Sequence, residues 1–488
     1  MKSELKSHGR KQIELKCSYP VTENKTSLYN LNLWIFIPGS LGFVQNKDSV
    51  GNFFSNIKCL TRFSPARISL SVLLNPDYEP SPLNRIEKGI TSAGMKKDIE
   101  SDKIIYELRS LANIVSSELS EIENIISDTI KKGQFPVIRS SLKKHISEIK
   151  DFIEKWRSLY HLFLRSNIKV KIRNAYLWTD ESLSLSIEQF FYKIYGIVKD
   201  IEDSESVIKK IFKIMDNEIK HRKNMGYLYL SKKTDEEMLE HRIYRDSILK
   251  KWAQSVLYLT KENTGHGKRW EHIFAGIAAA TAMSVAAAAT ILDQIYFPGR
   301  QIPWIIIVIT AYIFKDRIKE VLRKLLVNTF KSKVTDELVH LIDQSNSKKI
   351  GKLKSGVRFL KTSSIPRNIY TMRYSQKNPF RQFLPEEAVI NFSREVFIQN
   401  QMLKNYHKRV ENITDIIRIK FDDLFTHMDE PEKKTASFAW NPPREITGKR
   451  VYHVYVITEI NEEKTNKQTS GNYRLILSRN GIERIERI

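Results

Sequence analysis

The stretch IFAGIAAATAMSVAAAATIL, Ile273–Leu292, decides the first interpretation of this sequence. It contains no charged residue, and as a helix rising about 1.5 Å per residue it spans the roughly 30 Å hydrocarbon core of a bilayer. A second apolar run, Ile302–Phe314, follows after a short turn and gives about 20 Å of helix. We therefore predict a two-helix transmembrane hairpin over residues 269–314, with a re-entrant second segment as the alternative.

The charges around these runs predict the orientation of the hairpin. Lys268 and Arg269 precede the first run and Lys315, Arg317 and Lys319 follow the second, whereas the turn carries Arg300 alone. Positive residues collect on the cytoplasmic side of a membrane. We therefore expect a multi-pass protein with cytoplasmic N- and C-termini.

Small residues recur every fourth position in the first apolar run, which is the spacing of close helix packing in membranes. The predicted helix-packing residues are Gly276, Ala280, Ser284 and Ala288. A neighbouring row is formed by Ala278, Ala282 and Ala286. Two interpretations stay open: the row receives the second helix of the same chain, or several copies associate as a homo-oligomer.

The rest of the chain is polar and basic. The 488 residues carry a formal net charge of +24, with a mean hydropathy of -0.38. Two cysteines, Cys17 and Cys59, are too few for a disulfide framework and suit a reducing compartment. We divide the chain into an N-terminal α+β or β region (1–75), a linker (76–96), a cytoplasmic helical bundle (97–268), the hairpin (269–314), a basic juxtamembrane segment (315–381) and a C-terminal α+β domain (382–488).

Periodicity supports this division. Strand-like alternation occurs in residues 11–17, 31–37, 67–74 and 451–460, and residues 473–488 predict a β-hairpin with a type I′ turn at Asn480-Gly481. Between residues 97 and 262, apolar residues recur in steps of three and four. The predicted fold class is mainly α with smaller β or α+β regions: a helical bundle plus the hairpin. An extended coiled coil is the alternative to the bundle.

A basic run over residues 346–381 has no acidic residue. Next to a membrane, each Lys or Arg near an anionic leaflet contributes about 1 kcal/mol of binding. We therefore predict a site for anionic membrane lipid; a solvated basic face is the alternative, and we do not expect nucleic acid as the partner. The predicted lipid-binding residues are Lys348, Lys349, Lys352, Lys354, Arg358, Lys361, Arg367 and Arg373.

No motif predicts an enzyme. Glu218 with His221, and Glu337 with His340, have the spacing that places two metal ligands on one helical face, as in di-iron bundles. The two pairs lie on opposite sides of the hairpin, and Glu218 and His221 lie among Lys220, Arg222 and Lys223, so we predict exposed helix surface for both pairs. A second group, also predicted to be exposed acidic surface, comprises Asp422, Asp423, His427, Asp429 and Glu430. We predict no catalytic residue, no metal and no cofactor.

Two short stretches carry a resemblance. LNLWIFIP (31–38), followed by Ser40-Leu-Gly42, and YIFKDRIKE (312–320) resemble a group of uncharacterised bacterial inner-membrane proteins of similar length. The resemblance implies a bacterial inner-membrane protein with the same hairpin, and it provides no activity and no site residue that could be transferred to this chain.

Together these patterns predict a non-enzymatic membrane scaffold or sensor with cytoplasmic domains. The alternatives are an oligomeric pore-forming or membrane-disrupting effector, and an enzyme whose motif one sequence does not reveal. The protein partner is left open.

Overall fold

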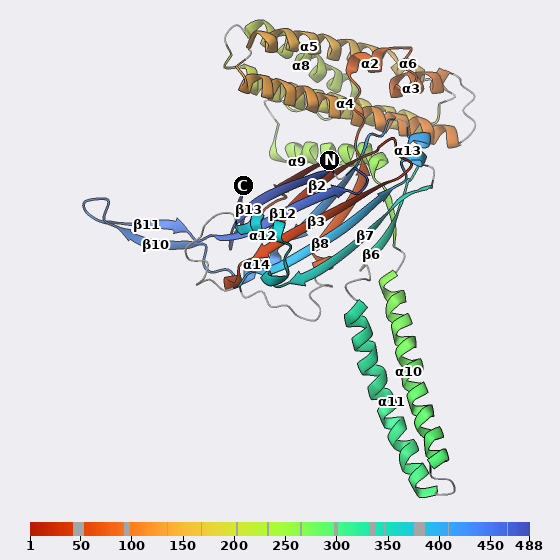
Figure 1. The fold of residues 1–488 in the computed structure, drawn as a ribbon. Helices are drawn as coiled ribbons and strands as arrows, with labels where there is room; N and C mark the ends of the chain where they lie inside the picture. The colour runs from red at the N-terminus through yellow and green to blue at the C-terminus, as the bar shows by residue number, and fades with distance from the viewer. Residues whose placement is uncertain are drawn as a thin grey trace. The chain divides into compact units, whose positions relative to one another are not determined.

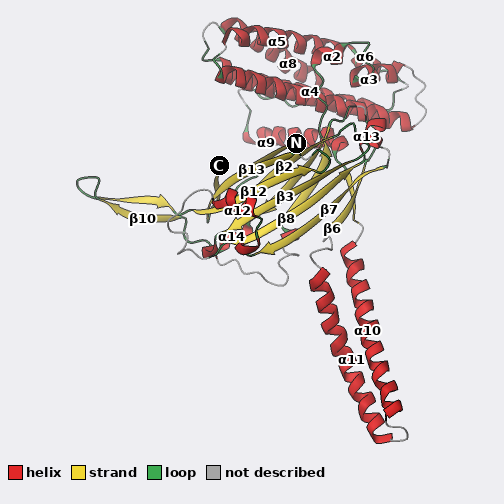
Figure 2. Ribbon diagram, in the orientation of Figure 1, coloured by secondary structure: helices red, strands yellow, loops and turns green. Residues whose placement is uncertain are grey.

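The computed structural model describes residues 1–41, 53–91, 98–133, 135–166, 168–201, 204–231, 234–263, 266–296, 301–330, 337–345, 347–374, 386–407, 409–465 and 467–488. The chain divides into two compact units (Figures 1 and 2). Unit 1 comprises residues 1–61, 259–403 and 412–488, and unit 2 comprises residues 62–258 and 404–411. Each unit is therefore built from segments that lie far apart in the sequence.

Unit 1 is organised by an eight-stranded antiparallel sheet in the order β14-β13-β12-β3-β8-β7-β6-β5. Its strands are β3 (Ser27–Ile37), β5 (Thr260–Asn263), β6 (Glu337–Ile342), β7 (Lys349–Leu360), β8 (Ala388–Ile398), β12 (Tyr452–Glu462), β13 (Gln468–Ser478) and β14 (Gly481–Arg487). The turn between β13 and β14 has a positive φ of 127° at Gly481 and none at Asn480, so it is not the predicted type I′ turn.

The central strand β3 is buried on both faces. Leu31, Leu33 and Ile35 alternate toward one face, as their period of two predicts. On the other face, Trp34 and Phe36 pack with Ile369 of the short helix α12 (Arg367–Tyr374). Strand β3, from the N-terminal region, therefore lies in the middle of a sheet whose other strands come from later in the chain.

A second sheet in unit 1 has the order β1-β2-β9-β4. Its strands are β1 (Lys2–Ser7), β2 (Gln12–Pro20), β4 (Ile57–Phe63) and β9 (Asn412–Lys420). Arg394 of β8 forms an ion pair of 2.6 Å with Asp415 of β9, and both side chains are buried. Thr61 of β4 also donates a hydrogen bond to Asp415. The two sheets are therefore joined through a charge pair removed from water.

Unit 1 also contains the segment that holds the two apolar runs. Helix α10 (His266–Tyr296) and helix α11 (Gln301–Phe330) lie side by side, and they follow β5 and precede β6 in the chain (Figure 1). Because β5 and β6 pair with each other, both ends of this α10–α11 insertion belong to one edge of the large sheet. Unit 1 also contains α14 (Asp422–Thr426) and a two-stranded ribbon of β10 (Glu432–Ser437) and β11 (Arg444–Lys449). Helix α13 (Asn400–Tyr406) begins in unit 1 and ends in unit 2.

Unit 2 is helical. Its helices are α2 (Leu70–Leu74), α3 (Pro82–Thr91), α4 (Asp98–Lys131), α5 (Phe135–Ser158), α6 (Tyr160–Phe163), α7 (Val170–Val198), α8 (Glu205–Met225) and α9 (Glu236–Gln254). The apolar recurrence predicted between residues 97 and 262 is confirmed in α5, because Leu142, Ile149 and Trp156 are buried in one continuous core with residues of α4 and α7. Helix α9 starts at an N-cap, Asp235, whose side chain accepts a hydrogen bond from the Met238 backbone.

The predicted fold class, mainly α, is wrong. The described residues contain fourteen strands in three sheets, the largest with eight strands. The basic run illustrates the reason: in β7, Lys352, Lys354 and Arg358 lie on the face opposite Leu353 and Val357, so the charges hide a period of two. Residues 67–74, predicted as a strand, instead contain α2.

The predicted pair of transmembrane helices is also wrong. Among the described helices, only the window His272–Leu292 in α10 is long and apolar enough to cross a membrane. The apolar run of α11 ends at Phe314, where Lys315, Asp316 and Arg317 follow at once, so it is shorter than the roughly 30 Å hydrocarbon core. A multi-pass inner-membrane protein with both termini in the cytoplasm is therefore not supported.

Replacing Asp415 with Asn tests the contact between the two sheets. The change leaves the buried Arg394 guanidinium without its counter-charge, so we expect the free energy of unfolding to fall by about 3–5 kcal/mol. The neighbouring Glu395 on β8 is exposed and pairs with Lys354, and Glu395→Gln should cost less than about 1 kcal/mol. Urea unfolding of the full-length variants measures both. Equal losses would show that the buried pair has no special part in joining the sheets.

Candidate functional site

The α10–α11 insertion exposes a large apolar surface. Only 11% of the window His272–Leu292 is buried, although a core helix of this composition would be mostly buried. On both helices, large apolar side chains are about half exposed or more: Ile277, Met283, Val285, Ile291, Leu292, Ile305, Ile306, Ile309, Ile313 and Phe314. Contiguous apolar surface of this kind indicates contact with lipid or with another protein.

The two helices pack through one face each. Among the α10 residues whose burial is described, Phe274, Ala278 and Ala282 are buried, spaced four apart. On α11, Ala311, Lys315 and Ile318 are partly buried at spacings of four and three. The alanine row that the sequence places beside the predicted packing row therefore forms the intrachain contact.

The predicted helix-packing residues lie elsewhere. Gly276, Ala280, Ser284 and Ala288 are all exposed, and a Cβ added at Gly276 would meet nothing within 4 Å. Residues two positions apart in a helix point in directions about 200° apart around the helix axis. This row therefore lies on the side of α10 away from Ala278 and Ala282. The row does not receive α11, and its association with further copies stays a prediction.

A cavity of about 280 Å³ lies between the two helices. Its walls are formed by Ala282, Val285, Ala286, Ala289, Thr310, Ala311, Phe314, Lys315 and Ile318. Lys315 is its one charged residue, and the ammonium lies 4.0 Å from the centre of the Tyr312 ring. Lys315 and Ala282 both line the cavity, and Ala282 lies in the middle of the apolar run of α10.

The predicted lipid-binding residues divide between a strand, a helix and turns. Lys349, Lys352, Lys354 and Arg358 lie on β7, Arg367 and Arg373 on α12, and Lys348 and Lys361 beside β7. Carboxylates neutralise part of this charge: Lys349 lies 3.0 Å from Glu262 and Lys354 lies 2.9 Å from Glu395.

Arg373 is held by other groups of unit 1. It pairs with Glu387 and stacks 3.5 Å from the centre of the Tyr455 ring. These contacts reduce the positive potential that the basic run offers to lipid, and its role in lipid binding stays a prediction. Lys377 and Arg381, in the same run, lie outside the described residues.

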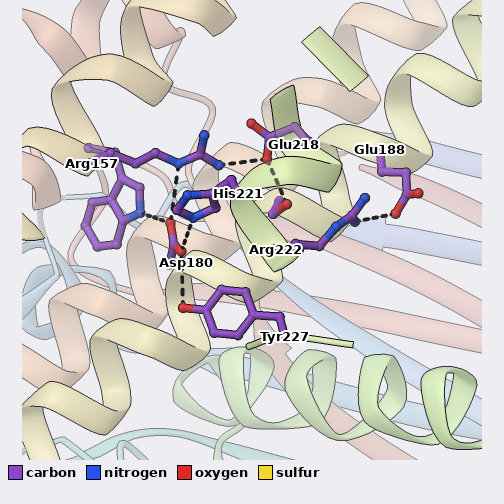
Figure 3. Close-up of polar contacts among 9 residues, drawn as sticks. Arg157, Asp180, Glu188, Glu218, His221, Arg222 and Tyr227 are labelled. Carbon is purple, nitrogen blue, oxygen red and sulfur yellow. Dashed lines mark hydrogen bonds and ion pairs between the residues drawn. The ribbon is translucent and has the colours of Figure 1, made fainter. Parts of the chain in front are cut away.

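Unit 2 holds a buried polar network centred on Asp180 of α7 (Figure 3). One carboxylate oxygen accepts a hydrogen bond of 2.9 Å from Trp156 Nε1, and the other lies 2.7 Å from His221 Nε2 and accepts one of 3.2 Å from the Tyr227 hydroxyl. Burial, with the adjacent Asp180 carboxylate, raises the pKa of Tyr227, so the phenol stays a neutral donor. This carboxylate therefore joins α5, α7, α8 and the segment after α8.

Glu218 forms the second centre of this network. Its carboxylate accepts hydrogen bonds of 2.7 Å from Arg157 Nη2 and from the Ser184 hydroxyl. Arg157 also lies 3.9 Å from Asp180, which links the two centres. Because the partners of both carboxylates are side chains of unit 2, the network has the character of a structural cross-link rather than of a site that awaits a ligand.

The prediction of exposed helix surface for Glu218 and His221 is therefore wrong, since Glu218 is buried and His221 is only partly exposed. Glu337 and His340 lie on strand β6 and not on a helix. Within the described part of the chain, no group of three or more His, Cys, Asp or Glu side chains could hold a metal. The acidic cluster that includes Asp422, Asp423 and Asp429 is exposed, as predicted.

Sequence reasoning missed Asp180, although its position offers a signal. Ile172 and Tyr176 precede it at steps of four and Ser184 follows at the same step, all on the buried stripe of α7. A charged residue on a buried stripe requires a partner.

No family model, no curated protein and no solved structure matches this chain. The resemblance to uncharacterised bacterial membrane proteins therefore stays a prediction.

Replacing Asp180 with Asn should destabilise unit 2. The amide cannot accept from all the donors that meet at the carboxylate, so we expect a loss of about 2–4 kcal/mol in the free energy of unfolding. Asp151→Asn is the matched control because Asp151 is exposed on α5, and it should stay within about 0.5 kcal/mol of the wild type. Denaturant titration followed by circular dichroism compares them, and equal stability of the two variants would contradict the cross-link.

The contact of Glu188 with two arginines in unit 2 predicts that the free energy of unfolding depends on pH. Burial raises the pKa of Glu188, but hydrogen bonds from Arg222 and Arg242 outweigh burial and hold that pKa below its usual value. The ionised Glu188 carboxylate therefore stabilises the fold fully above its unfolded-state pKa of about 4.3. This stabilisation is lost as the pH falls through the lower pKa of the folded state.

Glu188→Gln should therefore lower the free energy of unfolding by about 1.5–3 kcal/mol at pH 7. The gap to the wild type should shrink as the pH falls below about 4. Unfolding curves recorded at several pH values measure this gap. A gap that stays constant down to pH 2 would contradict the assignment.

Proposed function

We propose that this protein is a membrane-attached, non-enzymatic scaffold or sensor, held at a lipid bilayer by its α10–α11 insertion. The observation that carries the proposal is the exposed apolar surface of α10. Only 11% of the window His272–Leu292 is buried. Transfer of such side chains from water into hydrocarbon is favourable by about 25 cal/mol per Å². Lipid supplies this environment without a partner protein.

The pairing of β5 with β6 supports attachment from one side. Both ends of the insertion join neighbouring strands of one sheet. The insertion must therefore leave and return on the same side of the bilayer. Unit 2 and the sheets of unit 1 are then exposed to the aqueous phase, where they are available for binding partners.

The polar network of unit 2 supports a scaffold or sensor over an enzyme. Asp180 and Glu218 are the type of buried carboxylates that often carry catalysis. Here their hydrogen-bond partners are the neighbouring helices, so their chemistry serves the architecture of the unit.

Flotation of the full-length protein with phosphatidylcholine vesicles tests the attachment. We expect wild-type protein to float, and Ile291→Glu with Ile309→Glu to abolish flotation, because each charge in hydrocarbon costs about 2.5–3.5 kcal/mol. The control variant carries Val170→Glu and Tyr192→Glu at exposed apolar positions of α7 in unit 2. It should float like the wild type.

Two outcomes would contradict the proposal. Wild-type protein that stays at the bottom of the gradient with every vesicle composition would exclude lipid attachment. Equal flotation of the Ile291/Ile309 variant and the wild type would exclude the insertion as the attachment element.

A second candidate function is an oligomeric, membrane-disrupting effector. The exposure of Gly276, Ala280, Ser284 and Ala288 on the outer side of α10 favours it, because small residues let helices of several chains approach closely. Gly276→Leu together with Ala280→Leu should then abolish oligomers and dye release from vesicles. A monomeric mass of the wild-type protein in mild detergent would exclude this function.

A further inference from the structure

The cavity between α10 and α11 exists because the facing side chains are short. Ala282, Ala286 and Ala289 of α10 face Ala311 of α11, and methyl groups cannot fill the space between two helix backbones. The result is an open, mostly apolar space of about 280 Å³. Apolar cavities of this kind hold water poorly and bind apolar ligands.

Lys315 is a charged residue in the wall of an otherwise mostly apolar groove. Lys315 is partly buried, and no carboxylate lies within ion-pair distance of its ammonium among the described residues. Arg317 and Lys319 follow two and four residues later on α11 and add positive potential beyond Phe314. A cation at the end of an apolar groove has the charge pattern that complements an anionic amphiphile.

We propose that this groove binds one anionic phospholipid, with an acyl chain along Ala282, Ala286 and Ala289 and the phosphate on the Lys315 ammonium. The inference rests on the proposed function, because the bilayer supplies the ligand. It also gives the insertion a depth: Lys315 lies at the headgroup level, and the residues of α11 before it lie in hydrocarbon.

The geometry supports this depth. Residues 301–314 of α11 rise about 21 Å as a helix, less than the roughly 30 Å of a full hydrocarbon core. The partner residue Ala282 lies in the middle of the apolar run of α10, so the half of α10 nearer to β5 lies level with the basic part of α11. The groove therefore lies where apolar and charged surroundings meet, as acyl chain and phosphate do in a lipid.

The test compares lipid retained by full-length protein after extraction in mild detergent from vesicles of phosphatidylcholine mixed with phosphatidylglycerol. Wild-type protein should retain phosphatidylglycerol in preference to phosphatidylcholine. Lys315→Gln should reduce the retained phosphatidylglycerol at least tenfold. Lys319→Gln removes an exposed charge one turn further along α11, and it should reduce retention by no more than the roughly fivefold effect of a single surface charge.

Ala286→Phe provides a variant with unchanged charge, because the ring fills the groove. It should reduce retention to the level of Lys315→Gln while the protein still floats with pure phosphatidylcholine vesicles, which shows that the insertion remains intact. Inorganic phosphate should not displace the bound phosphatidylglycerol, since it lacks the acyl chain.

The outcomes separate this inference from the proposed function. Equal effects of Lys315→Gln and Lys319→Gln, full retention in Ala286→Phe, or displacement by inorganic phosphate would overturn the lipid site while attachment stands. Failure of the wild-type protein to float with any vesicle would overturn both.

Discussion

The pairing of β5 with β6 is the constraint on which the rest of the structure depends. These short strands form the edge of the eight-stranded sheet, and the whole α10–α11 insertion lies between them in the chain. Backbone hydrogen bonds fix the two ends of the insertion next to each other. Whatever the apolar helices contact, the chain leaves from β5 and must return to β6, the strand that pairs with β5.

The same sheet explains why the N- and C-terminal regions cannot be separate domains. Strand β3 pairs with β8 on one side and with β12 on the other, so residues 27–37 are completed by residues 388–398 and 452–462. The second sheet repeats this arrangement, because β2 pairs with β9. The buried pair of Arg394 and Asp415 then joins the two sheets, at a cost in desolvation that only close geometry offsets.

Local patterns in the sequence predicted many elements and few of their partners. Stripes with steps of three and four predicted α4, α5 and α8, and alternation predicted β2, β3 and β12, because periodicity reports which face of an element is buried. Strand pairing depends on contacts between segments that are distant in the sequence, and the periodicity of one segment gives no information about its partner. The strand β7 was missed because its lysines were interpreted by charge alone, and Glu218 was placed on the surface because Lys220 and Lys223 surround it in the sequence, although it lies on the opposite face of α8.

The central claim is that the α10–α11 insertion enters lipid while unit 2 and the sheets of unit 1 stay in water. An environment-sensitive fluorophore on full-length protein with Ile309→Cys measures this most directly, with Cys17→Ala and Cys59→Ser removing the native thiols and Tyr192→Cys as the site for comparison. The account predicts a blue-shifted emission on addition of phosphatidylcholine vesicles at residue 309 and no shift at residue 192. An unchanged emission at residue 309, or equal shifts at both positions, would contradict it.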